Sequence, residues 1–444
     1  MKRRRIVVLI FLLNVILTGG AFAAEIWVSP KGSDNNAGTR QQPLATIAMA
    51  IRKARELRRL NDASIKGGIH IKVLAGVYQL AEPLFIRPED SGTAESPTFI
   101  EGEGIGKTIL SGGITIAGWR KVTSEVPGLP AEAKGKVWVA DGSVISDEPF
   151  QFRQLWVNNE KAIRTRDTDA PLMNRILSWD HKTETCVIPW SASTDTSHLQ
   201  GMEMFIHQWW AIAILRVKAV KVMGDSARLS FYQPESRIQS EHPWPAPWIS
   251  KKTGNSAFYL SNSISFLNHP GEWFRDRIAN KIYYIPRKGE DLQTAVVTVP
   301  QLETLVKIEG TLDRPVNYVS FKNISFEHSN WLRPSKEGLV PHQAGMYMLD
   351  AYKLKIPGTP DKKGLENQAW VGRPKAAVEI AYASHITFDG CGFEHMASTG
   401  LDFQRGTHND VVKGSLFKDI GGTAVLDGVY SDEAQEVHLP YNPT

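Results

Sequence analysis

Cysteine is the residue that this sequence uses least, with two in 444 positions. Cys186 and Cys391 stand alone, and neither a CxxC motif nor a paired Cys/His spacing occurs, so a structural zinc site is not expected. An exported chain permits one disulfide between them, but two isolated cysteines are more often buried apolar residues. We expect buried free thiols, and the bridge stays open as the alternative.

The sequence also lacks an excess of one charge. It contains 51 lysines and arginines against 47 aspartates and glutamates, and four of the basic residues fall in Lys2–Arg5. The rest of the chain, with 47 residues of each sign, is neutral overall. Nucleic-acid binding depends on a basic face, so no nucleic-acid partner is expected.

Long apolar runs are absent apart from one near the start, at Ile6–Leu17. Basic residues precede this run and Ala21-Phe22-Ala23 follows it, which is the pattern of a secretory signal peptide. No later segment approaches 18 consecutive apolar residues. We therefore predict a signal peptide over residues 1–23, cleavage near Ala23, and a secreted or periplasmic protein with no stable membrane anchor.

Helical periodicity is nearly absent as well. One apolar stripe at helical spacing follows Pro43–Thr46 and consists of Ile47, Ala50, Ile51, Ala54 and Leu57. A lone amphipathic helix ahead of short strands suits the open end of a β-solenoid, where it covers unpaired backbone and core side chains. The polar loop Gly32–Thr39 is given no catalytic role, although its Asp34 and Asn35 have oxygens that can bind a metal ion.

Short strands and turns fill the rest, and a repeat is visible in the last 130 or so residues. Phe321, Phe388 and Val412 precede Phe326, Phe393 and Phe417 by five positions, with Asn323, Gly390 and Gly414 between them. Val378–Ile380 is echoed by Leu401–Phe403 and then by Ala424–Leu426. The period of about 23 to 24 residues, with short strands and turn glycines, predicts the coils of a parallel β-helix.

This rhythm is lost between about Gly118 and Thr298, where hairpin-like strands such as Lys281–Ile285 appear instead. We predict three units after the signal peptide: residues 24–117 with the cap and first coils, 118–298 as an inserted antiparallel β domain, and 299–444 as further coils. The fold class is therefore all-β, a right-handed parallel β-helix (pectate-lyase-like solenoid) with an N-terminal capping helix and an inserted antiparallel β domain.

Two stretches resemble a known enzyme family. Ile26–Asp34 with Pro43–Ile47 resembles the opening of secreted β-helix carbohydrate-active enzymes. Gln154–Asn158 with Ala162–Arg164, and Pro270–Phe274 with Tyr283-Tyr284, are similar to the insertion domain of glycoside hydrolase family 141. The resemblance implies glycosidase activity on plant cell-wall glycans, reported as fucosidase or xylanase activity in different members. Relatives continue for several coils beyond Thr444, so residues 299–444 are expected to be a truncated part that lacks some catalytic machinery.

Glycoside hydrolysis needs two carboxyl groups that face one bond. Glu379 and Asp402 occupy equivalent places 23 residues apart, each between two apolar residues. If those neighbours point inward, both acids point outward from one sheet, one rung apart. We therefore expect Asp402 and Glu379 to act as nucleophile or acid/base, with Asp427 close by on the next coil. Outward carboxylates on a solvated sheet with no function are the competing interpretation.

Other polar and aromatic residues lead to two further hypotheses. Phe326-Glu327-His328 recurs as Phe393-Glu394-His395, where repeated turn chemistry is favoured over a metal site or a proton relay. His207 beside Trp209 and Trp210 predicts a platform for a sugar ring, with a packed hairpin core as the alternative.

The leading hypothesis is a glycoside hydrolase that acts on plant cell-wall or other complex polysaccharide, without a cofactor and as a monomer. A polysaccharide lyase that cleaves uronate-containing glycans with a Lys or Arg base and calcium is the rival enzyme. A truncated, non-catalytic glycan-binding protein is the third possibility.

Overall fold

The computed structural model describes residues 23–142, 151–168, 173–191, 199–241, 247–342, 345–350 and 371–428. The signal peptide predicted over residues 1–23 lies outside these residues except for its last position, and so does the end of the chain after residue 428. Within the described part, no helix is both long enough and apolar enough to span a bilayer.

Three parallel sheets form the main body, stacked coil upon coil. Sheet A consists of β1 (Ala24–Val28), β2 (Ile69–Val73), β5 (Thr98–Glu101), β25 (Val319–Lys322), β31 (Thr387–Asp389) and β35 (Val411–Lys413). Sheet B consists of β3 (Gly76–Gln79), β6 (Thr108–Ser111), β26 (Ser325–Ser329), β32 (Gly392–Met396) and β36 (Leu416–Ile420). Sheet C consists of β4 (Leu84–Ile86), β23 (Val306–Glu309), β29 (Ala376–Ala381), β33 (Thr399–Phe403) and β37 (Val425–Asp427). A small fourth parallel sheet consists of β24 (Val316–Asn317), β30 (Ala383–Ser384) and β34 (Thr407–His408).

The predicted parallel β-helix is confirmed, and its core shows why the phenylalanines recur. Phe326, Phe393 and Phe417 are paired in register along sheet B, and their rings stack with centroids 5.0 and 4.7 Å apart. The turn from sheet A to sheet B needs a left-handed residue, which Asn323 (φ 55°) and Gly390 (φ 64°) supply. The repeat is thus a ladder of buried rings between tight turns.

One part of the predicted register is wrong. The pattern aligned Ala424–Leu426 with Leu401–Phe403, whereas Leu401 pairs with Val425 and Phe403 pairs with Asp427. The last coil is one residue longer than expected at this point, because it takes the spacing that separates Phe393 from Phe417. Leu426 is therefore the residue opposite Asp402.

The predicted capping helix is α1 (Ile47–Arg59), which packs on the first coils and buries its apolar stripe in the β-helix core. Thr46 caps its first turn by accepting a hydrogen bond from the Met49 amide. Asp34 has a structural role here, because its Oδ1 accepts hydrogen bonds from the amides of Ala45 and Thr46 at 2.9 Å. The polar loop is thereby fixed to the start of the helix.

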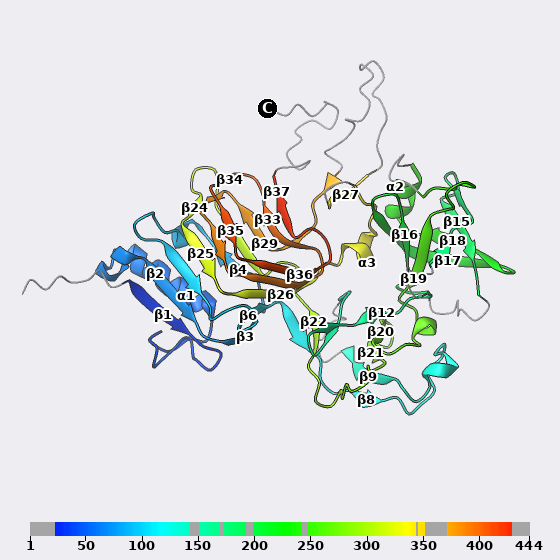
Figure 1. Cartoon of the computed structure of the whole chain (residues 1–444), viewed down its shortest axis with the longest axis horizontal. Helices are drawn as coiled ribbons and strands as arrows, with labels where there is room; N and C mark the ends of the chain where they lie inside the picture. Colours follow the sequence, from blue (N-terminus) through cyan, green and yellow to red (C-terminus); the bar gives the residue numbers. More distant parts are fainter. Residues whose placement is uncertain are drawn as a thin grey trace, which may run out of the picture.

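The β-helix is interrupted after β6 and resumes at β23, and the segment between them folds as an insertion (Figure 1). A four-stranded sheet at its base joins β7 (Gly113–Thr115), β22 (Val297–Pro300), β10 (Trp156–Val157) and β11 (Glu160–Lys161). A five-stranded sheet holds β8 (Arg120–Lys121), β9 (Trp138–Asp141), β21 (Lys281–Tyr284), β20 (Glu272–Asp276) and β12 (Ile163–Arg164). A seven-stranded sheet holds β13 (Asn174–Arg175), β19 (Ala257–Ser261), β16 (Glu203–His207), β17 (Ile212–Met223), β18 (Ser226–Phe231), β15 (Thr185–Pro189) and β14 (Ser178–Asp180), with α2 (Glu235–Glu241) beside it.

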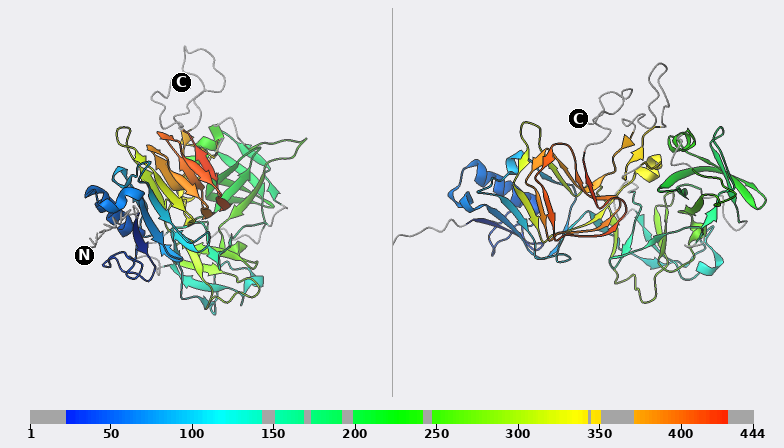
Figure 2. Two further views of the ribbon diagram at one scale, coloured as in Figure 1. Left: turned by 60° about the vertical axis from the view of Figure 1, so that its left-hand side comes forward. Right: turned by 45° about the horizontal axis from the view of Figure 1, so that its top comes forward.

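The inserted domain, cyan and green in Figures 1 and 2, lies at one side of the β-helix. Its pairings are antiparallel except for the short β12–β20 pair, as far as the described strands show. The two cysteines belong to different cores and are free, Cys186 in the insertion and Cys391 in the β-helix. The expectation of buried free thiols is therefore confirmed.

The segment between β26 and β29, called the connecting segment below, packs between the β-helix and the inserted domain. Its described elements are α3 (Arg333–Glu337), β27 (Tyr347–Met348) and β28 (Val371–Gly372). Val340 and Met348 of this segment share one apolar core with the insertion strands and with Leu426 of sheet C. The outer face of sheet C is therefore covered on this side by the connecting segment and the insertion.

Candidate active site

The site predicted on sheet C lies in one outward column of side chains. The register places Lys307, Glu379, Asp402 and Leu426 side by side on four successive strands. Their neighbours Val378, Ile380 and Leu401 are buried in the β-helix core. The alternation of a strand therefore turns Glu379 and Asp402 to the outer face, as the sequence pattern required.

Asp402 is held by an arginine from the connecting segment. Arg373 Nε donates to Oδ2 at 2.8 Å and Arg373 Nη2 donates to Oδ1 at 2.6 Å, a bidentate ion pair. Gln404 Nε2 donates to the same Oδ2 at 2.8 Å. The Asp402 side chain has no solvent-exposed surface, so it is not the solvated carboxylate of the competing interpretation.

Glu379 stands one rung from Asp402 and is also buried, with 7% of its surface exposed. Its Oε1 lies 3.5 Å from Lys375 Nζ, and the adjacent strand contributes Lys307. Parallel strands lie about 4.8 Å apart. Two carboxyl groups on adjacent rungs therefore fit the spacing of about 5–5.5 Å used by retaining glycosidases.

Asp427 does not share this face. Its register partner is Phe403, whose ring packs in the β-helix core, whereas Leu426 is the residue opposite Asp402. Asp427 acts instead on Asp410. Burial raises the pKa of Asp410 to about 6, and the negative charge of Asp427 contributes to this rise. The extra residue in the last coil separates Asp427 from the pair that the sequence placed it with.

The three residues predicted to contact sugar are grouped at one hairpin of the insertion. His207 ends β16, and Trp209 and Trp210 lie in the turn before β17. The two tryptophans are 68% and 54% exposed, and Trp209 is tilted against Trp248 with ring centroids 5.5 Å apart. His207 packs against Tyr259, and burial lowers its pKa. The hairpin therefore presents exposed rings rather than a closed core.

The repeated Glu-His motif lies on the outer face of sheet B. Glu327 pairs in register with Glu394, and the rings of His328 and His395 stack with centroids 5.1 Å apart. Both histidines have left-handed backbone, with φ 64° and 59°, at the ends of their strands. Burial, with a further contribution from Glu394, raises the pKa of Glu327 to about 7. Burial lowers the pKa of His328 to about 3.

Sequence reasoning missed the partners of these residues. Arg373 and Lys375 precede β29 and belong to no repeat, so nothing in the 23-residue pattern indicated them. Asp419, which contacts His395, lies in the last coil two positions after Phe417, as His328 and His395 lie after Phe326 and Phe393, and it shares their left-handed backbone. The repeat was therefore a signal for Asp419, and a positively charged residue just before a strand with an outward carboxylate was the signal for Arg373 and Lys375.

Comparison with known proteins agrees with this architecture. A solved structure described as a glycoside hydrolase is 46% identical to this chain and superposes with a TM-score of 0.85, covering 95% of this chain and 70% of that one. Pectate lyase PEL9 of Emericella nidulans is 27% identical over 161 residues, which is 35% of this chain and 33% of the fungal protein. This chain thus spans about a third of the length of that curated relative.

The inserted region has its own match, since residues 135–287 correspond to the GH141 insertion domain. This match lies within the sheets that separate β6 from β23. Together with the solved glycoside hydrolase, it accounts for both bodies of the molecule. The chain therefore belongs to the glycoside hydrolases that carry the GH141 insertion domain.

Proposed function

We propose that this protein hydrolyses glycosidic bonds in plant cell-wall or other complex polysaccharide by a two-carboxylate mechanism, with Glu379 and Asp402 as the pair. The observation that supports this assignment is their register, because it sets two outward carboxyl groups one rung apart on sheet C. The face they occupy lies next to the connecting segment and the GH141 insertion. Export through the predicted signal peptide would bring the enzyme to such a substrate.

The surroundings of the two acids suit different roles. Asp402, fixed by Arg373 and Gln404, is oriented as a nucleophile, which must be an ionised group with a defined direction. Glu379, which contacts one lysine at 3.5 Å, is assigned the acid/base role. It would protonate the leaving oxygen and then activate water. Because Asp402 is fully buried, substrate binding has to displace the Arg373 guanidinium from one of its oxygens.

The exposed rings at the β16–β17 hairpin support a second part of the proposal. Trp209 and Trp210 offer flat apolar faces of the kind on which pyranose rings stack. His207 is the last residue of β16, next to this turn, and its imidazole offers a hydrogen-bonding edge. We place the binding of a polysaccharide chain here, away from the reacting bond.

The test is reducing-sugar release from a panel of plant cell-wall glycans by the full chain and three variants. Asp402→Asn and Glu379→Gln should each lower kcat by at least about 100-fold, since each removes one required carboxyl group. Glu394→Gln is the matched control, because Glu394 on sheet B is about as buried as Glu379 and also has a second glutamate, Glu327, on the adjacent rung. This variant should keep wild-type kcat.

The outcomes separate the alternatives. Loss of activity in Glu394→Gln with normal turnover in Asp402→Asn would move the site to sheet B. Binding of a glycan without turnover by the wild-type chain would identify a non-catalytic glycan-binding protein. Circular dichroism of each variant shows whether a loss reflects the chemistry or the fold.

A polysaccharide lyase is the second candidate, because the fungal relative is a pectate lyase and two cations face the proposed pair. Lyases of uronate-containing glycans use a lysine or arginine base. Calcium binds six to eight oxygens. The residues at the pair do not fit calcium, since Arg373, Gln404 and Lys375 occupy the carboxylate oxygens. Ultraviolet absorbance of unsaturated uronate products on pectate would establish lyase activity, and hydrolysis generates none.

A further inference from the structure

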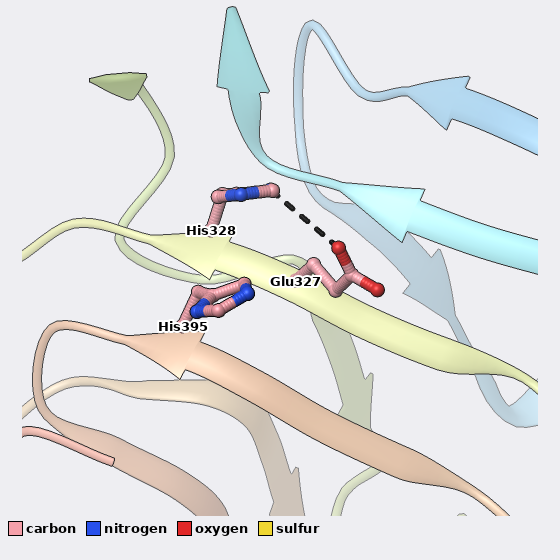
Figure 3. A group of neighbouring side chains, drawn as sticks. All are labelled: Glu327, His328 and His395. Atoms are coloured by element: carbon pink, nitrogen blue, oxygen red, sulfur yellow. Dashed lines mark ion pairs between the residues drawn. The ribbon is translucent and has the colours of Figure 1, made fainter. Parts of the chain in front are cut away.

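A second group of polar side chains lies on sheet B, apart from the proposed glycosidase pair (Figure 3). One carboxylate oxygen of Glu327 and one ring nitrogen from each of His328 and His395 all lie within 4.8 Å of one another. The three residues are 4%, 7% and 3% exposed. Side chains from two adjacent strands, β26 and β32, thus converge at one buried point.

Both histidines have a ring nitrogen with no partner. His395 Nδ1 donates to Asp419 Oδ2 at 2.9 Å, which leaves the lone pair on Nε2. The Nε2 atoms of His395 and His328 are both buried and form no hydrogen bond within the described part of the chain. A buried polar atom without a partner is unfavourable, so each of these two nitrogens has a lone pair or a proton available to a ligand.

The outer contacts of His395 are those of a metal-binding histidine. Asp419, which accepts from His395 Nδ1, also accepts from Trp156 Nε1 at 3.0 Å and from Lys161 Nζ at 2.8 Å. A carboxylate behind Nδ1 fixes the tautomer and the ring orientation of a metal ligand. The rings of His328 and His395 are further held by the Trp156 ring, whose centroid lies 5.0 and 5.4 Å from theirs. Ser111 Oγ lies 3.1 Å from His328 Nδ1.

The charge at this point is unbalanced. Asp419 has Lys161 as its counter-ion, and Glu394 has Lys418 at 3.8 Å. Glu327 forms no ion pair with a lysine or arginine within 4 Å among the described residues, and its ion-pair contact is His328 Nδ1 at 3.9 Å. A divalent cation would supply the missing positive charge.

We propose that Glu327, His328 and His395 bind one divalent transition-metal ion, for which Zn²⁺ is the probe. Two imidazole nitrogens and one carboxylate oxygen form a donor set that zinc favours, and three protein ligands leave a fourth position for water. Tetrahedral zinc holds its ligand atoms about 3.3 Å apart. The group therefore has to contract by up to about 1.5 Å on binding the ion. Through Asp419, the ion would connect the coil to β10 and β11 of the insertion.

The experiment uses the full chain, freed of metal by a chelator and dialysed against Zn²⁺, with zinc counted by mass spectrometry. Wild type should retain about one equivalent. Glu327→Gln and His395→Gln should lower the affinity at least about tenfold, since each removes one of three ligands. Asp419→Asn should lower it by about 10–100-fold without changing the stoichiometry. His385→Gln is the matched control, because His385 also has left-handed backbone (φ 58°) but packs on Tyr318.

Cobalt(II) gives a second measurement that does not depend on the variants folding. Bound at this site, Co²⁺ should show the visible absorption of a four-coordinate ion with nitrogen and oxygen ligands. Wild-type protein that retains no zinc, or a cobalt spectrum like that of the aqueous ion, would overturn the proposal. Equal zinc retention in Glu327→Gln and His395→Gln would overturn it too. Neither result depends on glycosidase activity, so this site and the Glu379–Asp402 pair are tested separately.

Discussion

Glu379 and Asp402 lie opposite each other on β29 and β33, and each contacts a cation from the few residues that precede β29. Arg373 forms two hydrogen bonds with Asp402, and Lys375 approaches Glu379. One short stretch of chain therefore sets the charge around both acids. Movement of this stretch would change the surroundings of the two acids together.

The first prediction concerns Arg373. Arg373→Ala should lower kcat on a small glycoside by at least about tenfold with little change in KM, because Asp402 loses the guanidinium that orients it, including the hydrogen bond that remains when substrate displaces the other. Arg373→Lys should not restore wild-type activity, since an ammonium cannot form the bidentate pair. Added guanidinium ion should partly restore kcat in Arg373→Ala. Arg314→Ala, at an exposed ion pair with Glu89, is the control. Unaltered kcat in Arg373→Ala would contradict a positioning role.

The sequence allowed the scaffold to be predicted because coils repeat a physical requirement. In each of three coils a phenylalanine (Phe326, Phe393 or Phe417) stacks on the ring of an adjacent coil. The preceding turn needs a residue with left-handed backbone, such as Asn323. The outward alternation of Glu379 and Asp402 follows from the same pattern. These features recur at fixed spacing and are therefore visible in one sequence.

The residues that complete the sheet C site do not recur. Arg373 comes from a connection that interrupts the repeat, so its distance along the chain from Asp402 does not reveal the contact. One extra residue in the last coil sufficed to turn Asp427 away from Asp402. The burial of Asp402 depends on how the connecting segment and the insertion pack, which a repeat cannot indicate.

The second prediction concerns the exposed tryptophans. Trp209→Ala and Trp210→Ala should each weaken binding to a polysaccharide by about 3–10-fold, as expected when one stacked ring is lost. The kcat on a small aryl glycoside should not change, since no reacting atom is involved. Affinity electrophoresis with soluble glycans provides the measurement. Leu312→Ala, at a side chain 82% exposed on the β-helix, is the control for loss of apolar surface. Equal affinity in all variants would disprove the platform.

The third prediction concerns a buried charge cluster that links the insertion to α3. Glu203 accepts from Arg153 at 2.5 Å, from Arg164 at 2.7 Å and from Ser335 Oγ at 2.7 Å. Burial alone would raise the pKa of Glu203, but Arg153 and Arg164 outweigh it and lower the pKa to about 2. Glu203→Gln leaves two arginines without their counter-ion, and should lower the free energy of unfolding by about 3–5 kcal/mol at pH 7.

The pH dependence gives this prediction a second check. Because the pKa of Glu203 is lower in the folded protein, its contribution is present above about pH 4.5 and is lost as the pH falls toward 2. The difference between wild type and Glu203→Gln in urea unfolding should therefore shrink between pH 7 and pH 3. Glu160→Gln, which removes an exposed partner of Arg287, should change stability little at either pH. A difference that is constant with pH would contradict the ion-pair account.

The last prediction concerns Asp167, whose burial acts in the opposite direction. Burial raises its pKa to about 6, even though its Oδ1 accepts a hydrogen bond from the Leu260 amide at 2.8 Å. The folded protein therefore binds this proton more tightly than the unfolded chain does. The stability linked to it is present at pH 4 and is lost as the pH rises through 6. Asp167→Asn keeps the acceptor for Leu260 and removes the buried charge.

Asp167→Asn should therefore stabilise the protein by about 3 kcal/mol at pH 8 and by less than about 1 kcal/mol at pH 4, as urea unfolding at the two pH values would measure. Asp180→Asn supplies the comparison within the same domain, because hydrogen bonds from Thr183 and Lys182 lower the pKa of this exposed acid. It should give no gain at pH 8. A gain for Asp167→Asn that is the same at both pH values would mean that packing, rather than an unfavourable buried carboxylate, explains the effect.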